Sequence, residues 1–160
     1  MYKITILCVG GLKESYWRDA VAEYQKRMKP FCRFTITEVP EERIPDKPSS
    51  SQIQAVVNAE GDKLLSKLDP ASLPIALCIE GKEQSSEQLA QTIERAAVGG
   101  EGNLTFMIGG SWGLSEAVKS KARVRLSMSP MTFPHQLARV MLCEQLYRAM
   151  QILSGGQYHK

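Results

Sequence analysis

The chain has 160 residues, 43% of them hydrophobic and 23% charged, with a formal net charge of +3. This length and composition predict one globular domain over residues 1–160 that buries roughly 70% of its unfolded surface without disulfides or metals. No stretch approaches the roughly 18 uncharged apolar residues that span a bilayer, so no membrane contact is expected. The charge is too mild to bind nucleic acid by itself, and the basic clusters at 26–29 and 119–125 fit solvated surface charge when each is taken alone.

The first part of the chain alternates strand and helix patterns. A β-rich run at 2–9 ends at two glycines, and apolar residues at helical spacing follow over 17–28 until a proline ends the helix. A second strand is predicted over 32–39, and a loop with three prolines over 40–51. Apolar residues from 53 to 68 then mark a second helix.

The next segment repeats this alternation. The continuous apolar run 75–79 is typical of a strand covered on both faces, and Gly81 is expected to end it. Ser85 and Gln88 have the spacing of a capping box, which predicts the start of a third helix with Leu89 on its inner face.

Two further strands are predicted before a long C-terminal helix. They span 104–108 and 124–128, and Ser115 is expected to cap a short helix between them. Strands that alternate with helices pair in parallel, because parallel neighbours need crossover connections. The sequence therefore predicts an α/β fold with a mainly parallel sheet of about five strands flanked by helices.

In such a sheet, ligands bind where loops leave the carboxyl ends of neighbouring strands. Three loops qualify, at Gly81, at 109–113 and at 128–134. The glycines of GGSWG at 109–113 would let the backbone approach a ligand closely, although a tight turn that binds nothing fits the motif equally well. The spacing differs from the GxGxxG of dinucleotide sites, and no glycine is followed by the lysine and hydroxyl residue of an ATP phosphate loop.

The C-terminal helix is apolar on more than one face. Leu146 belongs to one apolar face, while Val140 and Met141 make the other side apolar too. The sheet can cover only one of these faces, so the sequence predicts a symmetric dimer over the other. Glu144 and Arg148 stand four residues apart among these side chains, either as a surface ion pair or as a pair with a specific task.

The four cysteines lie far apart in the chain, at Cys8, Cys32, Cys78 and Cys143. No pair has the spacing of a zinc site or of a redox pair. We therefore expect reduced cysteines, most of them in the core of a cytoplasmic protein. Two histidines without clustered cysteines or carboxylates make a poor ligand set, so no metal is expected.

Three segments together resemble a known family. IGGSWGLSE at 108–116, LSMSPMTFPHQLARVMLCEQLYRA at 126–149 and the terminal YHK are similar to segments of the RlmH family of SPOUT-class methyltransferases. The likeness covers essentially the whole chain and includes VGGLKESYW at 9–17. GGxxG alone would be unspecific, whereas TFPHQ combined with LYRA and YHK is specific.

This resemblance implies a SPOUT-type fold with a C-terminal trefoil knot, a homodimer and S-adenosylmethionine as methyl donor. It implies methylation of N3 of a pseudouridine in 23S ribosomal RNA, with the assembled ribosome as partner. Carried over by position, the expected cofactor contacts lie in or beside the three loops named above: Leu77, Gly109, Met128, Ser129, Pro130, Met131, Thr132 and Phe133.

Methyl transfer from a sulfonium depends mainly on positioning, but the N3 of a pseudouridine carries a proton whose loss a catalytic group would assist. The candidates in the matching motifs are Arg148, His159, Tyr158, Glu144 and Arg139. We expect Arg148, His159 and Tyr158 to line the nucleotide pocket, with the tail reaching the site of the partner subunit. Arg139 is expected to hold phosphate or cofactor, and His135 to act as a helix cap or loop-shaping residue.

Two other functions stay open at this point. A non-catalytic module would bind S-adenosylmethionine or a nucleotide without transferring a methyl group. A SPOUT enzyme of different specificity would methylate transfer RNA. Labelled cofactor incubated with ribosomes and with transfer RNA separates all three.

Overall fold

The computed structural model describes residues 1–160 and contains five strands and five helices that alternate along the chain. The strands are β1 (Tyr2–Val9), β2 (Cys32–Val39), β3 (Leu73–Glu83), β4 (Asn103–Ile108) and β5 (Val124–Ser127). The helices are α1 (Ser15–Met28), α2 (Ser50–Lys67), α3 (Ser86–Val98), α4 (Glu116–Lys121) and α5 (His135–Leu153). The alternation predicted from the sequence is confirmed.

All five strands form one parallel sheet in the order β2-β1-β4-β3-β5. β4 is almost wholly buried and the second half of β1 is fully buried, as expected of parallel strands covered on both faces. The predicted parallel α/β sheet is therefore confirmed, while the knot implied by the resemblance stays a prediction. Because β4, β3 and β5 are neighbours, the loops that follow them leave the same edge of the sheet.

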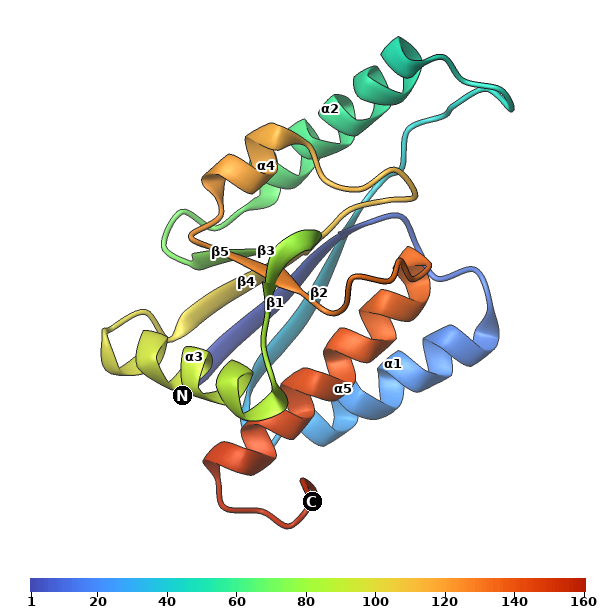
Figure 1. The fold of residues 1–160 in the computed structure, drawn as a ribbon. Coiled ribbons are helices and arrows are strands. Elements are labelled where there is room, and N and C mark those ends of the chain that lie inside the picture. The colour runs from blue at the N-terminus through green and yellow to red at the C-terminus, as the bar shows by residue number, and fades with distance from the viewer.

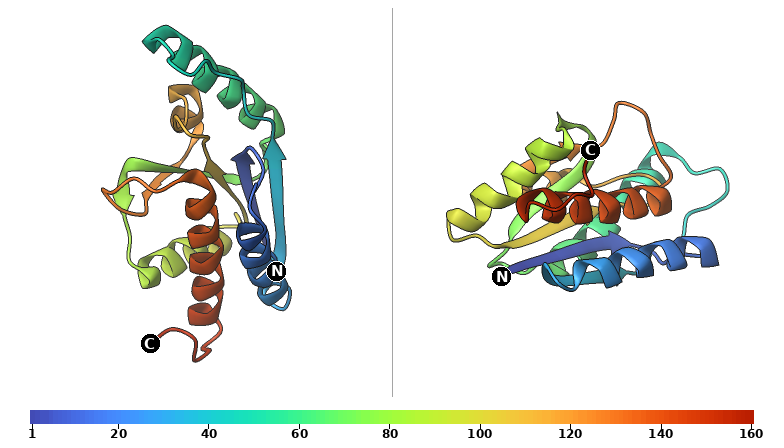
Figure 2. Two further views of the ribbon diagram at one scale, coloured as in Figure 1. Left: turned by 90° about the vertical axis from the view of Figure 1, so that its right-hand side faces the viewer. Right: turned by 90° about the horizontal axis from the view of Figure 1, so that it is seen from below.

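Helices cover both faces of the sheet (Figures 1 and 2). α1, α3 and α5 lie on one face, and α2 and α4 on the other. Alternate residues of β1 supply both cores, since Ile4 packs toward the first group of helices and Leu7 toward the second.

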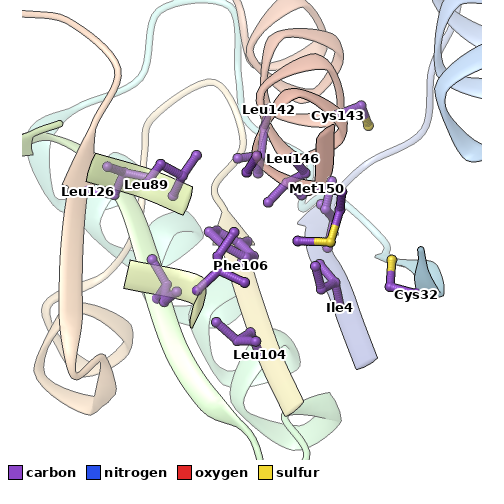
Figure 3. Packing of buried hydrophobic residues seen from close by; sticks show 14 of the residues in the cluster. Ile4, Cys32, Leu89, Leu104, Phe106, Leu126, Leu142, Cys143, Leu146 and Met150 are labelled. Carbon is purple, nitrogen blue, oxygen red and sulfur yellow. The ribbon is translucent and has the colours of Figure 1, made fainter. Parts of the chain in front are cut away.

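The larger core lies between the sheet and α5. Figure 3 shows Ile4 and Phe106 of the central strands near Leu142, Leu146 and Met150 of α5, and each of these side chains is at most 2% exposed. Burial of each such side chain stabilises the fold by about 1.5–3 kcal/mol. This packing fixes α5 across the sheet, and α5 in turn positions the C-terminal tail.

The predicted helix starts are also present. Ser85 and Gln88 form the expected capping box at α3, and the hydroxyl of Ser115 accepts a hydrogen bond from the amide of Val118 at α4. A further capping box, at the start of α2, joins Ser49 and Gln52. Each cap satisfies amides that the first helical turn would otherwise leave without partners.

The prediction that Gly81 ends the third strand was wrong. β3 continues to Glu83, and its register against β5 shifts between Leu77 and Lys82. A Cβ at Gly81 would lie 2.8 Å from the backbone of Arg125 and Leu126. The glycine therefore allows the close approach of β5 at this irregularity and does not stop the strand.

The cysteines are free thiols. Cys8, Cys32 and Cys143 are buried and Cys78 is partly exposed, so the prediction that most lie in the core is confirmed. Burial raises the pKa of the Cys143 thiol to about 12. None of the helices is both long and apolar enough to cross a membrane.

Candidate functional site

A cavity of about 770 Å³ opens at the carboxyl ends of β3, β4 and β5. Its walls are residues 77–79 within β3, the segment 108–114 after β4, and residues from the segment 128–135 between β5 and α5. Small-molecule sites typically enclose about 300–1,000 Å³. The loops after β4 and β5 thus meet as predicted, whereas the third wall is β3 itself and not the loop at Gly81.

The glycine motif forms a tight turn that cannot carry extra side chains. The amide of Gly113 donates to the carbonyl of Gly110 at 3.1 Å, and Gly113 has a φ of +84°. A Cβ at Gly109 would lie 2.5 Å from the carbonyl carbon of Gly113, so only glycine permits this turn. The motif therefore exposes backbone to the cavity at a place where no side chain intervenes.

A buried carboxylate packs against this turn. Glu60 of α2 is 4% exposed and accepts a hydrogen bond from the amide of Glu42 at 3.0 Å. Its Oε1 would lie 3.1 Å from a Cβ at Gly110, so the carboxylate packs directly against the turn. Burial raises the pKa of Glu60, because the charged form loses hydration.

Seven of the eight residues predicted to contact a cofactor line this cavity. They are Leu77, Gly109, Met128, Ser129, Met131, Thr132 and Phe133. The eighth, Pro130, lies in the same loop but is exposed and is not part of the wall. The loops after β4 and β5 bring the predicted segments to one cavity, while the direction in which each side chain points depends on the backbone geometry.

Other wall residues were not singled out as site residues. Trp112 lies within the GGSWG motif, whose position after a strand was the available signal. His135 is the first residue of α5 and lines the cavity, while the cap position belongs to Pro134, which makes no side-chain cap hydrogen bond. No sequence pattern indicated Lys119 or Ala138, which approach the cavity only through folding.

The cavity wall carries little net charge. Lys119 is its one lysine or arginine, and the ammonium group is paired with the Glu80 carboxylate, which raises the pKa of Lys119. Burial, followed by the nearby Arg139 charge, lowers the pKa of His135, so this ring is neutral at pH 7. A largely apolar ligand surface is therefore compatible with the wall.

Four of the five predicted catalytic residues meet at the C-terminal end of α5. Arg148 Nη2 donates to Glu144 Oε1 at 2.6 Å, and the Tyr158 hydroxyl donates to the same oxygen at 3.0 Å. The Arg148 guanidinium lies 4.7 Å from the centroid of the Tyr158 ring, and its Nη1 is 3.2 Å from His159 Nδ1. We call Glu144, Arg148, Tyr158 and His159 the tail cluster.

The hydrogen bonds assign protons within the tail cluster. Arginine can only donate, so His159 Nδ1 accepts from Arg148, and Nε2 carries the proton donated to Glu87 at 2.7 Å. The bond from His159 lowers the pKa of Glu87 to about 2. Burial, aided by the Glu144 carboxylate, raises the pKa of Tyr158 to about 12, so its phenol stays protonated at neutral pH.

Arg139 is the fifth predicted catalytic residue, and the structure does not bring it to the tail cluster. It lies nine residues before Arg148, about 13 Å along the helix axis. Its side chain is 2% exposed and donates to Glu38 Oε2 at 2.6 Å and to the Gly10 carbonyl at 2.7 Å. These contacts tie α5 to the ends of β1 and β2.

The tail cluster and the large cavity are separate within one chain. Glu144 instead lines a second cavity of about 490 Å³, together with Tyr24, Val140 and Met141. Met128 belongs to the walls of both cavities, so the two share one side.

Three solved structures share this fold at low identity. A probable methyltransferase from Bordetella pertussis Tohama I is 16% identical, with a TM-score of 0.56 over 93% of this chain and 96% of that one. A probable methylase family protein from Haemophilus influenzae Rd KW20 is 15% identical, with a TM-score of 0.53 over 98% of this chain and 70% of that one. TrmJ from Z. mobilis ZM4 is 19% identical, with a TM-score of 0.51 over 92% of this chain and 69% of that one.

At such identities the three structures show likeness of fold alone. The sequence match is more specific, since the family described as "Predicted SPOUT methyltransferase" matches residues 2–159. This match spans both cavities, the glycine turn and the tail cluster. The chain belongs to the SPOUT methyltransferase family.

Proposed function

We propose that this chain is a homodimeric, cytoplasmic methyltransferase that uses S-adenosylmethionine to methylate N3 of a pseudouridine in 23S ribosomal RNA on the assembled ribosome. Membership of the family supports methyl transfer. The finer assignment is supported by the RlmH-like segments of the sequence. The observation that carries the proposal is that these segments, separated in the chain, supply most of the wall of one cavity.

The wall fits the proposed cofactor. Gly109 and Gly113 leave backbone accessible where a Cβ would block it, and Leu77, Met128 and Phe133 provide apolar surface. The residues that would hold the cofactor are those seven predicted contacts that line the cavity. When bound, the cofactor supplies an electrophilic methyl group on its sulfonium centre.

The chain's own task is then to hold the target base in line and to ease the loss of its N3 proton. Arg148 is suited to stabilising negative charge that develops on the base, because its guanidinium is always charged and is fixed in place by Glu144. His159 Nδ1 has a lone pair that can accept a proton once the Arg148 bond is exchanged for the base. Tyr158 offers an aromatic face for stacking.

The separation of the tail cluster from the large cavity supports action across a dimer. Within one chain, Arg148, Tyr158 and His159 do not line that cavity. Val140 and Met141 of α5 remain only half-buried beside the second cavity. We therefore propose that two copies pack through this side of α5, and that the tail of one copy completes the cavity of the other.

Basic side chains beside the tail cluster support an RNA substrate. Lys26, Arg27 and Lys29 are exposed at the end of α1. The Arg27 guanidinium lies 5.7 Å from the centroid of the Tyr147 ring, which packs edge-on against Tyr158 at 4.7 Å. The sequence cluster at 26–29 therefore adjoins the proposed nucleotide site, where it can contact phosphates.

The test offers labelled S-adenosylmethionine and the purified chain to unmodified ribosomes, free large and small subunits, and transfer RNA. We expect label in the RNA of the large subunit, with assembled ribosomes as the best substrate. Arg148→Ala is expected to lose this transfer, while Arg33→Ala, on the exposed edge strand β2, keeps it. Label in transfer RNA alone, or cofactor binding without transfer to any RNA, would overturn the proposal.

A further inference from the structure

Exposed apolar side chains gather at the mouth of the large cavity. Six large hydrophobic residues of the chain are exposed, and three of them line this cavity: Ile79 at 49%, Trp112 at 47% and Met131 at 73%. Single exposed apolar residues need no explanation, but several grouped at a concave site indicate a ligand surface. Trp112 is the largest of the three and has the flattest surface.

The Trp112 side chain projects from the glycine turn, whose backbone has little room to rearrange. Trp112 is the residue just before Gly113, whose amide closes the turn onto the Gly110 carbonyl at 3.1 Å. Gly109 and Gly110 are both buried, and neither has room for a Cβ without displacing a neighbour. A rigid backbone that carries a half-exposed aromatic ring loses little entropy when the ring binds a ligand.

The charges of the wall decide which ligand group suits this ring. Lys119 is already paired with Glu80, and His135 is neutral because its pKa is lowered. A phosphate would meet no free cation here, whereas a flat and uncharged ring can stack on the indole and contact aliphatic side chains. A purine ring satisfies this condition.

We infer that Trp112 is a binding residue whose indole packs against the purine ring of the cofactor, with Ile79 and Met131 closing the same apolar mouth. This inference rests on the proposed function and assigns a contact that the matching motifs do not specify. It makes cofactor affinity depend on an aromatic side chain within the glycine turn. The reaction itself would proceed without the indole if the cofactor concentration were high enough.

The chain offers a matched pair for the test, because Trp112 and Trp17 are its only two tryptophans. Trp17 lies in α1, half-buried and edge-on to Tyr16, and lines none of the cavities described above. Trp17→Phe therefore leaves Trp112 as the only indole reporter, and Trp112→Phe leaves Trp17. The probe is S-adenosylhomocysteine, followed by intrinsic fluorescence and by titration calorimetry.

We expect S-adenosylhomocysteine to change the fluorescence of Trp17→Phe but not that of Trp112→Phe. Loss of one stacking partner typically weakens binding about 5- to 150-fold, so Trp112→Ala should raise Kd by at least about fivefold. Trp112→Phe keeps an aromatic face and should stay within about threefold of the wild type. The thermal midpoint of each variant should match that of the wild type, since the side chain is half-exposed.

The outcomes separate this inference from the proposed function. If calorimetry shows binding while the fluorescence of Trp17→Phe does not change and Trp112→Ala binds like the wild type, the inference is overturned and the proposed function stands. A fluorescence change with an RNA oligonucleotide but not with S-adenosylhomocysteine overturns the inference in favour of an RNA contact. Absence of S-adenosylhomocysteine binding to the wild type overturns the proposed function itself.

Discussion

Replacement of Gly109 by alanine tests whether the glycine turn shapes the cofactor site. The added Cβ would lie 2.5 Å from the carbonyl carbon of Gly113 and 2.9 Å from the amide nitrogen of Leu114. Ordinary van der Waals contact begins near 3.4 Å, so the turn must retreat by about 0.9 Å. Because the obstructing atoms are backbone, no side-chain rotation can relieve the clash.

This displacement sets the expected magnitudes. Overpacking of a close-packed site costs about 1–3 kcal/mol of folding free energy. A misplacement of about 1 Å at an active site can cost on the order of 100-fold in reaction rate. We therefore expect Gly109→Ala to unfold at lower urea concentration and to bind S-adenosylmethionine at least about tenfold more weakly.

Gly102 provides the matched control at the other end of the same strand. A Cβ there would lie 3.9 Å from the side chain of Ala97, which is ordinary contact, and its φ is not positive. Urea unfolding and titration calorimetry of both variants complete the test. If Gly109→Ala binds the cofactor like the wild type, or if Gly102→Ala is equally impaired, the role assigned to the turn is refuted.

Three further predictions concern charged residues. Arg139→Ala should cost about 3 kcal/mol in urea unfolding, since it empties a site where the side chain is 2% exposed and leaves the Gly10 carbonyl without its donor. Arg148→Ala should cost about 1 kcal/mol yet lose methyl transfer, because Tyr158 and Gln145 still donate to Glu144, and equal costs would contradict this division. Glu60→Gln should be more stable than the wild type at pH 8. Because the pKa of Glu60 is raised, the stability of the wild type falls as pH rises from about 4.5 through the folded pKa. Below pH 4.5 the two proteins should have the same free energy of unfolding in urea. The pKa of Glu87 is about 2 in the folded chain, and NMR titration should show it return toward 4.5 in His159→Asn. In the wild type, the stability that this pair contributes should be present above pH 4.5 and lost as pH falls toward 2.

Local patterns were sufficient for most of the fold. The strand at 2–9 and the strand at 32–39 were predicted with the bounds that the structure has. Ser85 with Gln88 marked the start of α3, because a capping box is a contact between residues three positions apart. The rule that ligands bind at the carboxyl ends of parallel strands selects the segments 109–113 and 128–134 from the sequence pattern alone.

Long-range contacts account for what the sequence did not reveal. Arg139 pairs with Glu38, 101 positions away, and no local spacing encodes that pair. Glu60 is buried against a turn 50 positions later, although its sequence neighbours suggest an ordinary helix surface. Gly81 was expected to end a strand, whereas here it makes room for β5 where the register shifts, which only the paired strand reveals.

The most direct test of the central claim is to locate the methylated nucleotide. Ribosomes that lack the modification are incubated with the chain and S-adenosylmethionine, and their RNA is digested and mapped by mass spectrometry and reverse transcription. A methyl group on N3 occupies the pairing edge of the base, so we predict one new transcription stop in 23S RNA, at a pseudouridine that gains the mass of one methyl group. Unmodified 23S RNA, or a methyl group at a base other than a pseudouridine, would contradict the account.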